Sequence, residues 1–277
     1  KGWGRIDEVE RTLHEKAELI QARYLERHRR LGMPSPAIHN DPYTMETWTH
    51  PTQPSDGLWT SYHVTAMAMA YSLTGEERYK ESAREGMEAL YLLQNITEIE
   101  GLVARTMASV DEPAAKQHRG AHDWRETSGG KYIWRDDVSS DQIDGHYFAF
   151  YTYYEHIAKH DPAEKARIQK QIRQVTDYIV DNGLQIIDWD GKVTLWGWWY
   201  PERLQKPIHY LESALYSMLM LSHLKVAHHI TGDAKYDDLY RNLIEEHNYL
   251  SNMLLTKKLY PDELNHSDDQ MSAIGYY

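Results

Sequence analysis

Residues 73–79 read Leu-Thr-Gly-Glu-Glu-Arg-Tyr, and residues 230–236 read Ile-Thr-Gly-Asp-Ala-Lys-Tyr. Each copy follows an apolar run and precedes a charged amphipathic run, and residues 159–165 (Lys-His-Asp-Pro-Ala-Glu-Lys) stand between two such runs as well. Glycine is the usual residue just past the end of a helix, and proline is favoured at the first helical position. The recurring phrase therefore predicts three helix–turn–helix pairs.

The two helices of each expected pair differ in character. The first is rich in small, apolar and aromatic side chains, which is typical of a helix buried on all sides. The second carries an apolar stripe at helical spacing and charged residues elsewhere. We expect the first helices at residues 58–73, 143–159 and 208–230, and the second helices at residues 76–94, 162–181 and 233–247.

A buried inner helix that alternates with a wet outer helix predicts an all-α fold, an (α/α)n toroid that would be an (α/α)6 barrel when complete. An amphipathic helix from Ile6 to about Arg30 would be the first outer helix. Residues 267–277 would open another inner helix, so the chain is expected to lack the last helices of the ring. In this interpretation residues 1–277 form one toroid domain.

Two stretches interrupt the helical pattern. Residues 101–140 contain Gly129-Gly130, few apolar residues and no clear periodicity, which predicts a long insertion loop. Long loops in compact domains are usually functional. Residues 184–203 place Asp190-Gly191 between two apolar runs, which predicts a small β-hairpin.

The composition limits the classes of partner. The chain carries 42 acidic and 30 basic residues, a net charge of −12, and this argues against nucleic acid, which needs a basic surface. It has no cysteine and no apolar run of membrane-spanning length, so neither thiolate metal sites nor a membrane anchor is expected. Twenty-one Tyr and nine Trp against two Phe indicate half-wet aromatic surfaces such as ligand grooves.

Acidic residues recur where the inner helices open. Residues 54–59 read Pro-Ser-Asp-Gly-Leu-Trp, residues 139–144 read Ser-Ser-Asp-Gln-Ile-Asp, and residues 267–272 read Ser-Asp-Asp-Gln-Met-Ser. Ser-Asp before an apolar run is also a plain helix-capping signal, and capping is the alternative for Asp56, Asp141 and Asp269.

In a toroid the inner helices all start at one end, around a central cavity. Side chains at these starts would meet there, and converging carboxyl groups are what general acid–base catalysis requires. The expected catalytic residues are Asp144 as general acid/base, Asp141 and Asp56 as partner carboxylates, and His146 and His63 as assisting groups.

The stretch Gln142-Ile143-Asp144-Gly145-His146-Tyr147 is similar to the Asp-Gly-Leu-Tyr segment of the unsaturated glucuronyl and rhamnogalacturonyl hydrolases. The resemblance implies a toroid of six helix pairs and a catalytic acid/base role for Asp144. His146 stands where that family has Leu. The wider class of carbohydrate-active α/α toroids also includes polysaccharide lyases, which use Tyr, His, Asn and Arg.

Cationic and aromatic side chains are interleaved in the insertion and the hairpin. Arginine pairs with carboxylates, and flat rings stack on sugar faces, so this mixture predicts an acidic glycan as ligand. The alternative is a solvated loop whose arginines pair with Asp123, Glu126, Asp136 and Asp137. The expected substrate-binding residues are Arg119, Arg125, Arg135, Trp124, Trp134, Trp198, Trp199 and Arg203.

Together these features predict a glycoside hydrolase that acts on an acidic, uronate-containing oligosaccharide or polysaccharide. One rival is a polysaccharide lyase with Tyr147 or His146 as base, and another is a non-catalytic sugar-binding domain. No metal or cofactor motif is present; calcium at Asp136, Asp137 and Asp141 is the one conceivable exception. The inferred role points to a secreted or periplasmic protein.

Overall fold

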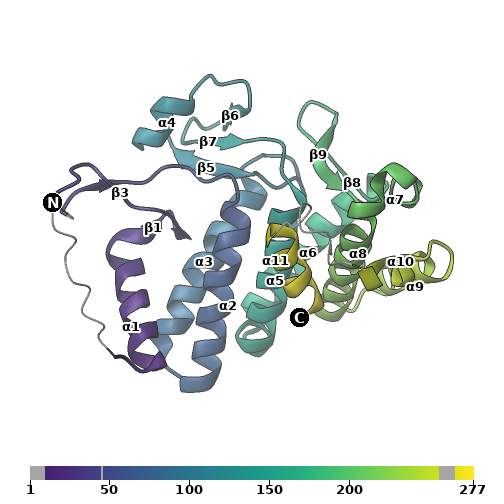
Figure 1. Cartoon of the computed structure of the whole chain (residues 1–277), viewed down its shortest axis with the longest axis horizontal. Coiled ribbons are helices and arrows are strands. Elements are labelled where there is room, and N and C mark those ends of the chain that lie inside the picture. The colour runs from purple at the N-terminus through teal and green to yellow at the C-terminus, as the bar shows by residue number, and fades with distance from the viewer. Residues whose placement is uncertain (1–9, 45, 256–265) are drawn as a thin grey trace.

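The computed structural model describes residues 10–44, 46–255 and 266–277. These residues form a mostly helical fold with four small antiparallel sheets (Figure 1). Within them, no helix is both long enough and apolar enough to cross a membrane.

The three expected helix pairs are present. Gly75 (φ 72°) and Gly232 (φ 75°) end the first and third inner helices in the left-handed conformation that glycine adopts without strain. Asp161 caps the second outer helix by accepting the N–H groups of Ala163 and Glu164. The pairs are α2 (Asp56–Thr74) with α3 (Glu77–Asn95), α5 (Ser140–His156) with α6 (Pro162–Asp181), and α8 (Tyr210–Thr231) with α9 (Ala234–Glu245).

The inner helices lie beside one another. Helix α5 packs against both α2 and α8, and α11 (His266–Tyr276), which is the fourth expected inner helix, packs against α5 and α8. All four enter from the side of the molecule that carries the small sheets (Figure 1). Their N-terminal ends therefore face the same region, as the sequence pattern predicts.

The first outer helix is shorter than expected. Helix α1 (Leu13–Arg23) continues into a π-helical turn (Tyr24–His28), and the chain then forms a hairpin of β1 (Arg29–Arg30) and β2 (Met33–Pro34). Leu31 and Gly32 both have positive φ in the turn, which ends the helix before Arg30. Residues 6–9 of the expected helix lie outside the described residues.

Residues 101–140 are not an irregular loop, which corrects the prediction for this insertion. Strand β7 (Tyr132–Arg135) pairs with β5 (Thr106–Ser109) on one side and with β6 (Trp124–Glu126) on the other. A short helix, α4 (Pro113–His118), packs against β5. The strands are only three or four residues long, too short for their alternation to show as a period in the sequence.

The predicted β-hairpin is confirmed. Strand β8 (Gln185–Ile187) pairs antiparallel with β9 (Val193–Trp198), and Gly191 has φ 81° in the turn between them. The remaining elements are short. They are β3 (Ile38–His39), β4 (Trp48–Thr49), α7 (Pro201–Leu204), α10 (Tyr249–Asn252) and 3-10 turns at Ala158–His160, Pro207–His209 and Met253–Leu255.

Candidate functional site

A pocket of about 300 Å³ opens where α5, α8 and α11 begin. Strand β9 and the segment before β5 contribute the remaining walls. It is therefore formed by three inner helices and by both segments that interrupt the helical repeat. Its lining residues are Arg105, Ser139, Ser140, Asp141, Trp196, Glu212, Leu215, Tyr216, Ser267, Asp268 and Met271.

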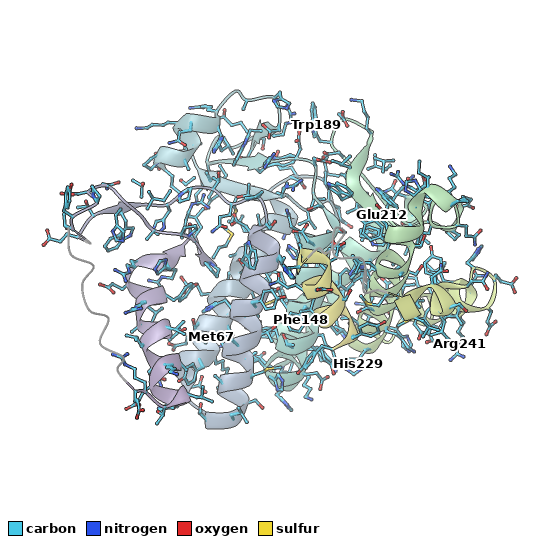
Figure 2. The ribbon with its side chains drawn as sticks, viewed as in Figure 1. Met67, Phe148, Trp189, Glu212, His229 and Arg241 are labelled. Atoms are coloured by element: carbon cyan, nitrogen blue, oxygen red, sulfur yellow. The ribbon has the colours of Figure 1, made fainter. Side chains whose placement is uncertain are left out.

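Three carboxylic side chains line this pocket, one from the first turn of each helix. They are Asp141 on α5, Glu212 on α8 and Asp268 on α11. The positive end of the helix dipole stabilises negative charge in a first turn, so each of these carboxylates is stabilised by the helix that carries it. Figure 2 labels Glu212 on α8, below the β8–β9 hairpin. One oxygen of Glu212, Oε2, is buried and has no hydrogen-bond partner among the described residues.

The acids of α2 and α5 do not serve as helix caps. Asp56 is the first residue of α2 and Asp141 the second residue of α5, and neither Ser55 nor Ser139 makes a capping hydrogen bond. The Ser139 hydroxyl instead donates to Oδ1 of Asp141. The capping alternative therefore does not account for Asp56 or Asp141.

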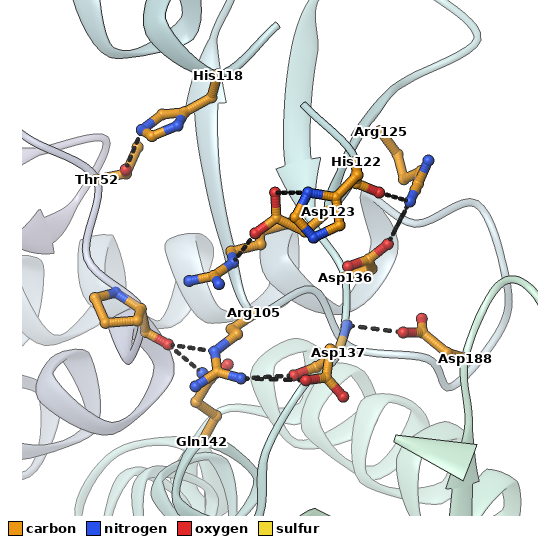
Figure 3. Close-up of polar contacts among 12 residues, drawn as sticks. Thr52, Arg105, His118, His122, Asp123, Arg125, Asp136, Asp137, Gln142 and Asp188 are labelled. Atoms are coloured by element: carbon orange, nitrogen blue, oxygen red, sulfur yellow. Dashed lines mark hydrogen bonds and ion pairs between the residues drawn. The ribbon is translucent and has the colours of Figure 1, made fainter. Parts of the chain in front are cut away.

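Trp196 supplies an aromatic wall of the pocket and Arg105 a cationic wall. Trp196 is 43% exposed and presents an indole ring to the pocket. The Arg105 guanidinium is held by the Pro54 carbonyl at 3.1 Å and the Asp137 carbonyl at 2.9 Å (Figure 3). Tyr216 completes the wall from α8. Burial raises the pKa of Tyr216 above its usual value, so its hydroxyl stays protonated at neutral pH.

Asp144, the expected general acid/base, does not line this pocket. It lies one turn beyond Asp141 on α5 and is 2% exposed, with Oδ1 at 3.6 Å from Nε2 of His223 on α8. Burial raises the pKa of Asp144 well above its usual value, and the charge of Asp141 raises it further. A protonated carboxyl suits a general acid, but here helix α8 covers it.

Asp56 is also buried, on the far side of α5 from α8. Its Oδ2 accepts the Thr106 hydroxyl at 2.5 Å and lies 3.8 Å from the Arg30 guanidinium, which also pairs with Glu112 at 2.9 Å. This group ties the N-terminal hairpin, α2 and strand β5 together. The structure thus places Asp141 at the pocket but brings neither Asp56 nor Asp144 to it.

The histidines predicted to assist lie between helices. His63 contacts the outer helix α3 through the Ser82 hydroxyl at 3.1 Å, and its ring lies 4.1 Å from that of Tyr24. His146 is fully buried, with Nδ1 at 2.9 Å from Nε2 of Gln94, and burial lowers its pKa to about 3. Tyr147, the alternative lyase base, donates to or accepts from Thr176 on α6 at 2.7 Å. None of the three lines the pocket.

The arginines predicted to bind substrate are paired within the insertion. Arg119 binds Glu126 at 2.6 Å, Arg125 binds Asp136 at 2.7 Å, and Arg135 binds Asp123 at 2.8 Å. The alternative raised for this segment, internal pairing of its charges, thus describes their contacts in the structure. Trp124 stacks on His118, and Trp134 is buried in the main core.

The aromatic cluster at the end of the hairpin is divided between the core and the pocket. Trp198 and Trp199 are 2% and 0% exposed and pack against Tyr216. The Arg203 guanidinium lies 3.6 Å from the ring centroid of Trp198 and so stacks on it. The pocket wall of this cluster is Trp196, two residues before the predicted pair Trp198 and Trp199.

Sequence reasoning missed Glu212 and Tyr216 as site residues, whereas Arg105 and Trp196 belong to the cationic and aromatic runs that it considered but were not among the residues expected to bind substrate. An acid in the first turn of every inner helix was a usable signal, because Glu212 stands at the opening of α8 although the Ser-Asp phrase is absent there. No such signal showed which tryptophan of β9 would be exposed at the pocket, because this strand buries Thr194, Gly197 and Trp198 in an irregular pattern.

Within the described part of the chain, no group of three or more His, Asp or Glu side chains is arranged to hold a metal ion. Asp136 and Asp137, which were considered for calcium, accept hydrogen bonds from Arg125 and from the Leu195 N–H, respectively. No protein-family model, curated protein sequence or solved structure matches the chain. The proposal for its function rests on the geometry of the pocket.

Proposed function

We propose that the protein is a glycoside hydrolase whose catalytic pocket lies at the N-terminal ends of α5, α8 and α11. The observation that carries the proposal is the pair Asp141 and Glu212, which line one pocket from neighbouring inner helices beside the exposed indole of Trp196. We further propose that the helix pairs belong to an α/α toroid, the architecture that would place all inner helix starts around one cavity.

Hydrolysis of a glycosidic bond needs two carboxyl groups on opposite sides of the bond. One donates a proton to the leaving oxygen, and the other activates water or attacks the sugar carbon. Glu212 has a buried, unpartnered oxygen that a bound hydroxyl could satisfy. The Trp196 ring would hold the apolar face of a sugar between these groups.

A uronate-containing substrate remains part of the proposal, with Arg105 as its partner. Arg105 is the cationic side chain among the pocket's lining residues, since Arg119, Arg125 and Arg135 pair with carboxylates elsewhere. A lyase mechanism has less support, because His146 and Tyr147 lie outside the pocket. Degradation of an external glycan would fit a secreted or periplasmic enzyme.

The first experiment follows ultraviolet absorbance of the C4–C5 unsaturated uronyl group. The protein is added to polygalacturonate, to its unsaturated fragments, and to xylan and cellulose oligosaccharides with a reducing-end assay. Loss of absorbance on the fragments, or new reducing ends without absorbance, supports a hydrolase. A rise in absorbance on the polymer would mean a lyase, and binding without turnover would mean a sugar-binding domain.

The catalytic pair is tested by Asp141→Asn and Glu212→Gln. We expect each to lower kcat by about 10²- to 10⁴-fold, because each removes a proton-transfer group or nucleophile while keeping the shape of the side chain. Glu126→Gln is the control, since it breaks an exposed ion pair away from the pocket. Asp144→Asn belongs in the same series: a loss of turnover in that variant alone would return the acid/base role to Asp144.

A further inference from the structure

Asp137 stands where the insertion, the hairpin and the pocket meet. It follows strand β7 and precedes α5 by three residues, and its backbone has φ 55°. Non-glycine residues rarely adopt this left-handed conformation, and Asp and Asn tolerate it best. Such strain persists only where the surroundings enforce it.

Contacts with three residues hold Asp137 in this conformation, and those with Asp188 and Arg105 are drawn in Figure 3. Its N–H donates to Oδ2 of Asp188 at 2.8 Å, in the segment between the two strands of the hairpin. Its carboxylate oxygen Oδ1 accepts the backbone N–H of Leu195 at 2.7 Å, in strand β9. Its carbonyl accepts from the Arg105 guanidinium at 2.9 Å, and its Oδ2 lies 3.7 Å from the same group.

These contacts converge on two walls of the pocket. Leu195 immediately precedes Trp196, so the bond to its N–H fixes the strand at the point where the exposed indole leaves it. Arg105 is the cationic wall. Asp137 therefore binds the strand residue next to Trp196 with its side chain and binds Arg105 with its carbonyl.

A second contact joins the same two segments. The Trp189 indole N–H donates to Oδ2 of Asp136 at 2.8 Å, and the Arg125 guanidinium lies 3.9 Å from the Trp189 ring centroid. This contact does not involve the side chain of Asp137, so we expect it to keep the hairpin attached when that side chain is altered. The contribution of Asp137 is to fix the position of strand β9 next to Trp196.

We propose that Asp137 is a positioning residue that sets the relative placement of Trp196 and Arg105, and through them the grip of the pocket on a sugar ring. The inference rests on the proposed function for its consequence in catalysis. Its structural half, the placement of Trp196, stands independently of any substrate.

Asp137→Gly and Asp137→Asn separate the side chain from the backbone. Glycine adopts φ 55° freely, so this variant removes the carboxylate without straining the backbone. Asparagine tolerates the same conformation and keeps an oxygen that can accept the Leu195 N–H. Glu98→Gly is the matched control: Glu98 has φ 61°, and its carboxylate accepts the backbone N–H of Ser128 at 3.0 Å away from the pocket.

The deciding measurement is fluorine NMR of protein labelled with 5-fluorotryptophan, in which loss of one of nine resonances in Trp196→Phe assigns Trp196. We expect the Trp196 resonance to shift and broaden in Asp137→Gly, and to return towards the wild-type position in Asp137→Asn. An unmoved resonance in Asp137→Gly, or an equal change in Glu98→Gly, would overturn the proposal.

The catalytic half is measured with oligogalacturonate as the probe. Loss of one positioning hydrogen bond should raise KM by about two- to tenfold in Asp137→Gly, with kcat nearly unchanged. In a Trp196→Ala background the same substitution should add little, because Trp196 carries the effect. Independent, multiplying losses would contradict the coupling. If wild-type protein neither binds nor cleaves the probe, the uronate part of the proposed function fails, while the resonance still decides the placement of Trp196.

Discussion

At the scale of single residues, two carboxyl groups on one helix have opposite environments. Asp141 lies in the first turn of α5 at the pocket, whereas Asp144 lies one turn further in, 2% exposed beneath α8. Both lie in the acidic stretch at the start of α5, and the sequence pattern predicts a catalytic role for both. Only the position of the neighbouring helix distinguishes them.

Gly145 shows the same dependence on a neighbour. A Cβ atom at this position would lie 2.7 Å from Cα of Leu58, closer than Cβ atoms approach atoms to which they are not bonded, and 3.0 Å from the carbonyl oxygen of Gly57, which is a very tight contact. Helices α2 and α5 can therefore cross this closely because Gly145 lacks a side chain, and a Cβ at Gly57 would also be tight, at 3.1 Å from the His146 ring. The glycine of the motif has a packing role whether or not the motif is catalytic.

We expect Gly145→Ala to lower the free energy of unfolding by about 1–3 kcal/mol, because the added methyl group meets backbone atoms that cannot rotate away. Urea denaturation of the variant measures the change. Gly129→Ala is the control, since nothing lies within 4 Å of a Cβ at that position. Equal stability of the two variants would show that α2 and α5 separate at little cost.

At the scale of elements, the sequence signals for helix ends were the most dependable. Gly75, Gly232 and Asp161 all have the predicted places at the ends of helices. The Ser-Asp signals before α2 and α5 located helix starts as well, but their side chains do not cap those helices. A capping pattern thus indicates a boundary more reliably than it indicates a hydrogen bond.

Asp161→Ala should lower the free energy of unfolding by about 1 kcal/mol, because two N–H groups at the start of α6 lose their acceptor. Ser55→Ala is the matched control at the start of α2, where the serine makes no capping bond, and should change stability by less than about 0.5 kcal/mol. Thermal and urea unfolding of both variants provide the comparison. A larger loss in Ser55→Ala would contradict this account of the helix starts.

At the scale of the whole molecule, the buried histidines and the buried Asp56 have opposite effects on how the stability of the fold changes with pH. Burial lowers the pKa of His63 to about 4 and those of His146 and His223 to about 3. The unfolded chain takes up protons at these histidines below about pH 6.5, so their contribution to stability is lost as the pH falls. Burial acts in the other direction on Asp56, whose pKa it raises to about 7 against the opposing Thr106 hydrogen bond and Arg30 charge.

The Asp56 contribution can be isolated with Asp56→Asn. Between about pH 4 and 7 the folded protein holds a proton on Asp56 that the unfolded chain has released, so this group stabilises the fold at low pH and the gain is lost as the pH rises to 7. The difference in unfolding free energy, wild type minus Asp56→Asn, should therefore grow by about 1.4 kcal/mol per unit as the pH falls from 7 to 4. Urea denaturation across this range measures it. A difference that stays constant across this range would mean that Arg30 keeps Asp56 ionised in the folded protein.

The sequence by itself determined the helix pairs, their ends, the β8–β9 hairpin and the gathering of acids at the inner helix starts. These features are encoded in residues close along the chain: glycine at a left-handed turn, an apolar stripe at helical spacing, an acid in a first turn. The three-stranded sheet in residues 101–140 escaped prediction because its short strands are stabilised by pairing with one another.

Only the tertiary structure decided which of these residues meet at the pocket. Asp141, Glu212 and Trp196 come from segments far apart in the chain, and Asp56 and Asp144 differ from Asp141 in what packs over them. The arginines of the insertion likewise found carboxylates within their own sheet. Exposure and ion pairing depend on the packing of distant segments, which no local pattern encodes.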